Sequence, residues 1–158
     1  MFFIKKNLSF ILIFFTIFSL DRISKYVIIK NYEKTGNSEF FSSLYFNLDL
    51  IWNKGISFGL FSFSSINTYN FITIIILAVI LGVFYMLIYS KKSEKIFFLL
   101  VFSGAVGNFY DRIVFKAVPD FIDLHVNNIH WFVFNVSDIF ITLGVLGLIF
   151  NEILKKKL

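Results

Sequence analysis

The sequence predicts a membrane protein with an all-α core, a bundle of four transmembrane helices carrying a small extracytoplasmic β-rich segment on the membrane surface. Composition is the first observation behind this fold class, since 58% of the 158 residues are hydrophobic and only 16% are charged. Soluble domains average about 45–50% apolar and about 25% charged residues. The second observation is that the basic residues gather at the ends of long apolar runs, as in multispanning proteins. We therefore expect a single membrane domain covering residues 1–158.

Four apolar runs approach the roughly 20 residues that a bilayer crossing needs. They predict spans near 8–28, 68–90, 95–113 and 133–154. The second run alone contains a long stretch without charge, whereas acidic and basic residues interrupt the other three. The first run has the basic start of a secretory signal peptide, but no small-x-small cleavage site follows it. We interpret it as a retained first helix.

Lysine clusters predict the orientation of these spans. They lie before the first span, between the second and third spans, and after the fourth. The positive-inside rule then places both termini and the 91–95 loop in the cytoplasm, with segments 30–67 and 114–132 outside. Within the first outer segment, Phe40–Trp52 is rich in aromatic and β-branched residues. This pattern predicts a hairpin or small sheet on the membrane surface.

Composition also excludes several classes of function. The chain has no cysteine, which excludes disulfides, a cysteine nucleophile and thiolate metal sites. The net charge of +5 comes from bases at the ends of apolar runs, whereas nucleic-acid binding needs a basic patch on a polar surface. Asp123, His125 and His130 suggest a metal site by residue type, but two histidines on a short interfacial loop are more typical of surface or hydrogen-bonded residues. We expect no metal, no cofactor and no nucleic acid.

Acidic residues in three of the spans predict a polar site. With the orientation above, Asp21, Asp111 and Asp138 fall at one depth near the outer surface, and ionisable residues within spans are usually functional. Asp120 precedes the last span and can meet Asp138. Two carboxyl groups in a dry pocket can share a proton and act on water as general base and general acid. The alternative is that the acids pair with neighbouring bases and only hold the helix ends together.

The polar neighbours of these acids suggest supporting roles. Asn108 and Arg112 are four residues apart and share one helix face, and Asp111 can form an ion pair with Lys25 or Arg22. Asparagine side chains can donate to a carboxylate or to a substrate carbonyl. For Gly55, a loop that clasps substrate and a simple turn are equally compatible with the sequence.

Five ordered blocks give the chain a family resemblance. They are Asp21-Arg-Ile-Ser-Lys25, Asn53-Lys-Gly-Ile-Ser-Phe-Gly59, Gly104-Ala-Val-Gly-Asn-Phe-Tyr-Asp-Arg112, Pro119-Asp-Phe-Ile-Asp123 and Phe134-Asn-Val-Ser-Asp138. In this order the blocks resemble the lipoprotein signal peptidases, or signal peptidase II, which are bacterial membrane aspartyl peptidases. The resemblance implies that Asp120 and Asp138 are the catalytic pair. It also implies supporting roles for Asp21, Lys25, Asn53, Gly55, Asn108, Asp111, Arg112 and Asn135.

The same resemblance implies a substrate and a location. The expected reaction removes signal peptides from diacylglyceryl-modified prolipoproteins by cleavage just before the lipidated cysteine, without a cofactor. The expected enzyme is a monomer in the bacterial inner membrane, in contact with membrane lipid, with its active site near the outer leaflet. Pro119, Ser137 and Ser103 depart from the family pattern. Pro119 lacks a backbone donor, which puts strand pairing beside Asp120 in doubt.

Two alternatives belong to other functional classes. A small transporter or an ion- or proton-binding membrane protein would use the acids as relay groups, but a relay needs ionisable residues spread across the membrane. A purely structural membrane protein would need the acids for stability alone.

Overall fold

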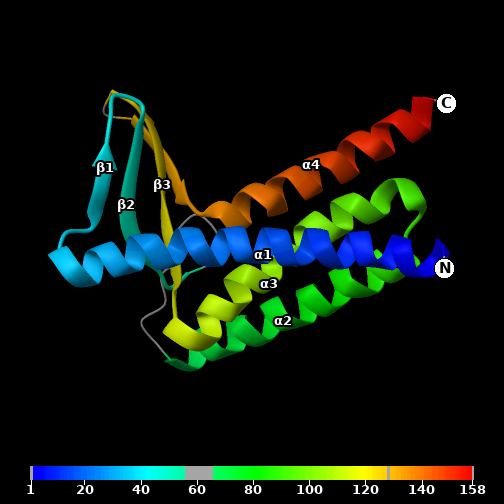
Figure 1. Cartoon of the computed structure of the whole chain (residues 1–158), viewed down its shortest axis with the longest axis horizontal. Coiled ribbons are helices and arrows are strands. Elements are labelled where there is room, and N and C mark those ends of the chain that lie inside the picture. Colours follow the sequence, from blue (N-terminus) through cyan, green and yellow to red (C-terminus); the bar gives the residue numbers. More distant parts are fainter. Residues whose placement is uncertain (1, 56–65, 128, 158) are drawn as a thin grey trace.

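The computed structural model describes residues 2–55, 66–127 and 129–157. Four helices run roughly lengthwise, and a sheet stands across one end of them (Figure 1). In chain order the elements are α1 (Phe2–Thr35), β1 (Glu39–Ser42), β2 (Phe46–Asn53), α2 (Ile66–Tyr89), α3 (Lys92–Phe115), β3 (Val118–Val126), β4 (Ile129–Phe134) and α4 (Val136–Lys157).

Three of the helices are long and apolar enough to cross a membrane. Within the described residues these candidate spans are Asn67–Tyr89, Lys92–Phe115 and Val136–Lys156. The helix α1 is 34 residues long, but Asp21, Arg22 and Lys25 interrupt its apolar sequence. The predicted helical core and small sheet are therefore confirmed. A bundle of four transmembrane helices is not confirmed, because α1 is not among the candidate spans.

The helix ends are arranged as the lysine clusters suggested. The start of α1, the connection between α2 and α3, and the end of α4 lie at the same end of the molecule, opposite the sheet (Figure 1). An ion pair between Lys155 and Glu94 joins the end of α4 to the start of α3. The three basic clusters thus belong to one end of the protein.

The sheet is antiparallel with the strand order β1-β2-β3-β4. The predicted hairpin within Phe40–Trp52 is confirmed by β1 and β2. The expectation of a short interfacial loop around His125 and His130 is wrong, because these residues lie on β3 and β4. Most of the first half of β3 is buried without alternation, so the segment lacks the period-two pattern by which half-buried strands are recognised.

Pro119 is accommodated at one end of β3. It pairs with Trp52 in β2, whereas the paired register of β3 with β4 begins at Ile122. Proline is tolerated where a strand lacks a second neighbour that needs its N–H group. The strand pairing put in doubt by Pro119 is therefore formed.

A small apolar core joins the sheet to α1. Ile28 of α1, Leu50 of β2 and Phe121 of β3 are buried against one another, and Val136 at the start of α4 packs on this cluster. Burial of each such side chain contributes roughly 1.5–3 kcal/mol. This core fixes β3, and hence Asp120, relative to α1 and α4.

Candidate active site

Asp120 and Asp138 lie where the sheet meets the helices. Asp120 belongs to β3 and is buried, and Asp138 lies in the first turn of α4. Asp120 Oδ2 accepts a hydrogen bond from Asn53 Nδ2 at 2.8 Å, and its Oδ1 accepts one from Asn135 Nδ2 at 2.5 Å. Asp138 Oδ1 accepts from Asn108 Nδ2 at 2.8 Å, and its Oδ2 accepts from the Asn135 backbone N–H at 3.1 Å. Each oxygen of both carboxyl groups thus has a donor.

Asn135 binds both acids and begins α4. Its Oδ1 accepts from the Asp138 backbone N–H at 3.2 Å, while Asp138 Oδ2 accepts from the Asn135 N–H. This reciprocal pair is a capping box, with asparagine as the N-cap and aspartate three residues later. The side-chain NH2 group of Asn135 donates one hydrogen bond to Asp120 Oδ1. The helix cap therefore fixes the two carboxyl groups relative to each other.

The orientation of each asparagine amide is set by a group that can only donate. Lys25 Nζ donates to Asn108 Oδ1 at 3.0 Å, and the Gly55 N–H donates to Asn53 Oδ1 at 2.9 Å. Since an ammonium or a backbone N–H has no lone pair to offer, the amide oxygen must face it. The NH2 groups of Asn108 and Asn53 are then left to donate to the two acids.

A buried ion cluster contacts Asn108 and so supports this arrangement. Lys25 Nζ lies 2.9 Å from Asp21 Oδ1 and 2.6 Å from Asp111 Oδ2. Arg22 pairs with Asp21 and donates to both oxygens of Asp111, at 2.5 and 2.9 Å. The predicted pairing of Asp111 with Lys25 or Arg22 is confirmed for both bases. Two cations and two anions balance one another, which is how buried charges are tolerated.

Arg112 connects this network to the loop after β2. Its Nη1 donates to the Asn108 carbonyl at 3.2 Å, as their shared helix face predicted. Its Nη2 donates to the Gly55 carbonyl at 3.1 Å. Gly55 is thus held at a turn closed by Asn53. Residues 56–59 of this motif lie outside the described residues.

The electrostatics distinguish Asp120 from an ordinary surface carboxyl group. Burial raises the pKa of Asp120 to about 7, and the neighbouring Asp138 carboxylate adds to the rise. The hydrogen bonds from Asn53 and Asn135 act on this pKa in the opposite direction. A group with a pKa near neutrality can hold and release a proton during a reaction.

Sequence reasoning missed the close approach of α3 and α4 beside the site. A Cβ atom on Gly107 would meet Ser137 Oγ, and it would lie 2.9 Å from Asp21 Oδ2. A Cβ atom on Gly104 would meet the Ser137 carbonyl. The Ser137 backbone N–H also donates to Asp21 Oδ1 at 3.1 Å. The signal available in the sequence was two glycines three residues apart, which lie on one helix face, since small residues are enriched where membrane helices pack closely.

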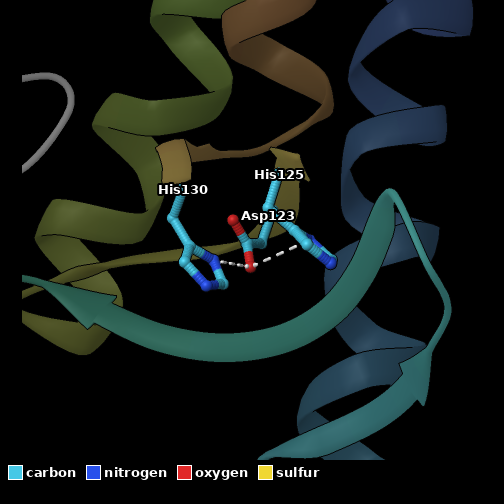
Figure 2. A group of neighbouring side chains, drawn as sticks. All are labelled: Asp123, His125 and His130. Atoms are coloured by element: carbon cyan, nitrogen blue, oxygen red, sulfur yellow. Dashed lines mark hydrogen bonds and ion pairs between the residues drawn. The ribbon is translucent and has the colours of Figure 1, made fainter. Parts of the chain in front are cut away.

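All of the predicted site residues join one hydrogen-bonded network through the contacts above. Arg22, expected only as an ion-pair partner, completes the buried cluster. The three residues weighed as metal ligands gather further along the β3–β4 hairpin (Figure 2). Beside Asp138, β4 and α4 line a largely apolar cavity of about 390 Å³.

Comparisons with known proteins agree on one family. A family model of signal peptidase (SPase) II matches residues 13–154. A lipoprotein signal peptidase of Pelagibacter ubique (strain HTCC1062) is 49% identical over 147 residues, covering 93% of this chain and 87% of the relative. A lipoprotein signal peptidase of Anaplasma phagocytophilum (strain HZ) is 38% identical and covers 96% of each chain. A bacterial membrane enzyme solved by the in meso method is 27% identical, with a TM-score of 0.75, covering 94% of this chain and 89% of that one.

Proposed function

This chain belongs to the signal peptidase II family, and on that premise we propose that Asp120 and Asp138 are its two catalytic carboxyl groups. The family consists of aspartic-type peptidases that cleave signal peptides from prolipoproteins. The observation that carries the assignment is that Asn135 binds both acids, with its side-chain amide on Asp120 and its backbone N–H on Asp138. The two carboxyl groups therefore share one buried polar site.

The proposed reaction is a general acid–base hydrolysis. Asp138, as carboxylate, takes a proton from a water molecule while the water oxygen bonds to the carbonyl carbon of the scissile peptide. Asp120 gives its proton to the carbonyl oxygen, for which a pKa of about 7 is suitable. The carbon–nitrogen bond of the resulting diol then breaks. The proton held by Asp138 passes to the leaving amine, and the proton of the added hydroxyl group returns to Asp120.

The surrounding residues position these groups. Asn108 donates to one oxygen of Asp138, and Asn53 donates to one oxygen of Asp120. Lys25 fixes the orientation of the Asn108 amide. Arg112 ties Gly55 to α3. Acids held by several donors keep one geometry while the reaction proceeds, which lowers the reorganisation needed in the transition state.

We place the dyad near the outer leaflet of the bacterial inner membrane. In this arrangement α1 is the fourth membrane span, and both termini and the α2–α3 connection face the cytoplasm. Support comes from the three basic clusters at the end of the molecule opposite the sheet (Figure 1). The helix α2 carries no Asp, Glu, Lys or Arg. The ionisable network lies toward the sheet, away from the end that carries the three basic clusters. A transport relay would need charges spread along the membrane depth.

The proposed substrate is a prolipoprotein whose cysteine already carries diacylglycerol, cleaved just before that cysteine by a monomeric enzyme. The apolar cavity beside Asp138 supports a lipid-anchored substrate. Its walls are formed by Leu124, Trp131, Phe132, Phe134, Ile139, Thr142 and Leu143 together with Asp138 itself. An apolar substrate segment can occupy this space while the scissile bond reaches the acids. A lipid anchor also confines the substrate to the membrane that holds the enzyme.

The test uses the purified protein in detergent. Wild type, Asp120→Asn and Asp138→Asn are incubated with a diacylglyceryl-modified prolipoprotein and with the same precursor lacking lipid. We expect cleavage of the lipidated precursor alone, and its loss in both variants. Glu39→Gln, a carboxyl-to-amide change at an exposed position of β1, is the matched control and should cleave like wild type.

Gel filtration and membrane fractionation show that each variant is folded and inserted. Full turnover by either aspartate variant would overturn the dyad assignment. Equal cleavage of the unlipidated precursor would overturn only the proposal that the substrate must carry a lipid. No cleavage by a folded wild-type protein would favour a membrane protein without peptidase activity.

A further inference from the structure

A second group of polar side chains lies on the β3–β4 hairpin, apart from the dyad network. Asp123 and His125 are two residues apart on β3, and His130 lies on β4. Figure 2 shows the three side chains turned toward one another. Their potential ligand atoms all lie within 4.8 Å of one another. His130 Nδ1 is 2.8 Å from Asp123 Oδ2, and His125 Nδ1 is 3.8 Å from the same oxygen.

A register shift in the hairpin brings the two histidines together. Asp123 pairs with Val133, but the register shifts by one residue before His125, which pairs with His130. Without the shift, Trp131 would lie opposite His125. Since a one-residue slip turns each side chain of a strand to the other face, this irregularity places His130 on the face of His125. The two imidazole rings stack with centroids 4.9 Å apart.

Two atoms of the group lack partners although they are buried. Within the described part of the chain, Asp123 Oδ1 and His125 Nδ1 are buried and make no hydrogen bond. The Asp123 and His125 side chains are only 7% and 10% exposed, whereas that of His130 is 53% exposed. Buried polar atoms without partners are uncommon and suggest a missing ligand such as an ion. His130, which contacts Asp123 Oδ2, is itself accessible from solvent.

We propose that Asp123, His125 and His130 bind one divalent transition-metal ion of the Zn²⁺ type. Two imidazoles and one carboxylate are ligands that this class of ion prefers. Tetrahedral ligation at about 2.0–2.1 Å places ligand atoms roughly 3.3 Å apart. The separations of 2.8 and 3.8 Å at Asp123 Oδ2 lie on either side of that value. Small side-chain rotations therefore suffice, and water takes the fourth position.

A second residue supports the carboxylate from the neighbouring strand. Asn47 of β2 pairs with Asp123 in the sheet, and its Nδ2 donates to Asp123 Oδ2 at 3.3 Å. Such outer contacts orient metal ligands and tune affinity. The bound ion joins β3 to β4 beyond Asp120, and thus stiffens the hairpin that carries Asp120 and leads into the cap of α4. This site is separate from the peptidase dyad and does not depend on its assignment.

The test is metal binding by the full chain, purified in detergent without a polyhistidine tag. Calorimetric titration with Zn²⁺ should give one saturable site per chain. Co²⁺ in place of Zn²⁺ should give the visible absorption bands of a tetrahedral complex with nitrogen and oxygen ligands. His130→Ala should weaken Zn²⁺ binding by at least about tenfold, and because its side chain is half exposed this change should leave the fold intact. His125→Ala should have the same effect.

Glu39→Gln, which removes an exposed carboxylate of β1 outside the group, is the control and should bind like wild type. Gel filtration establishes that each variant is folded, and His130→Ala decides the question if His125→Ala does not fold. Absence of saturable Zn²⁺ binding by wild type would overturn the proposal. Unchanged affinity in His130→Ala would also overturn it, and the three residues would then be a hydrogen-bonded cluster only.

Discussion

Removing the ammonium group of Lys25 tests whether the buried ion cluster holds the site together. Lys25 is 2% exposed and contacts Asp21, Asp111 and Asn108. Lys25→Met keeps an unbranched side chain of similar length but leaves two buried carboxylates with Arg22 as their remaining cationic partner. Removing one partner from a buried ion pair costs about 3–5 kcal/mol. At roughly 2–4 °C per kcal/mol for a chain of this size, the melting temperature should fall by about 6–20 °C.

The assay is thermal unfolding in detergent, followed by the fluorescence of Trp52 and Trp131 in the sheet. Peptidase activity, measured well below the melting temperature, should also fall. The reason is that Asn108 loses the donor that fixes its amide, and Asp138 then loses a firmly held hydrogen bond. Lys34→Met, at an exposed position of the same helix, is the control and should melt like wild type. A melting temperature for Lys25→Met equal to that of the control would refute the reasoning.

Three further predictions follow from the site. Because the pKa of Asp120 is raised from 3.8 to about 7, the folded protein keeps a proton that the unfolded chain has lost, so stability should fall as the pH rises from about 4 to about 7. The melting temperature of Asp120→Asn should fall less steeply with pH across this range. A pH dependence equal to that of wild type would contradict the raised pKa of Asp120. Gly107→Ala should destabilise by about 1–3 kcal/mol, because its Cβ meets Ser137 and Asp21. Gly82→Ala, with nothing within 4 Å, should be neutral or stabilising in the same denaturation experiment. Asn135→Ala should lower the free energy of unfolding by about 1 kcal/mol through the lost helix cap. It should also lower kcat while changing KM little, and a kcat equal to that of wild type would argue against its positioning role.

Hydropathy and motif order carried much of the prediction, since they depend on local sequence. Apolar runs located α2, α3 and α4 to within three residues at each end, because a membrane-spanning segment must pair its own backbone polar groups as a helix. The helix α1 extends six residues before and seven residues beyond its predicted span. Motif positions identified the polar residues that gather between α1, α3 and α4. The pairing of Asp111 with Lys25 followed from the predicted topology, which places the charged residues of the first and third spans at one depth.

The missed features depend on contacts that sequence spacing does not encode. β3 is buried on consecutive positions and contains Pro119, so neither alternation nor β-propensity predicts a central strand there. The capping box formed by Asn135 and Asp138 has a spacing that can be recognised in the sequence. The hydrogen bond from the Asn135 side chain to Asp120 depends on the folded sheet, so the sequence does not predict it. The close approach of α3 to α4 at Gly107 likewise depends on the shapes of both helix surfaces, which the sequence of one helix does not give.

The β3–β4 hairpin has a consequence for how the chain can vary in length. Both proposed catalytic acids flank this one hairpin, so their spacing depends on the ladder that begins at Ile122 and Phe134. Residues added at the tip, beyond Val126 and Ile129, would lengthen the far end and leave this ladder unchanged. One residue inserted between Asp120 and Ile122 would turn Asp120 to the opposite face of the strand. We expect natural length variation to concentrate at the tip and to be absent from the base.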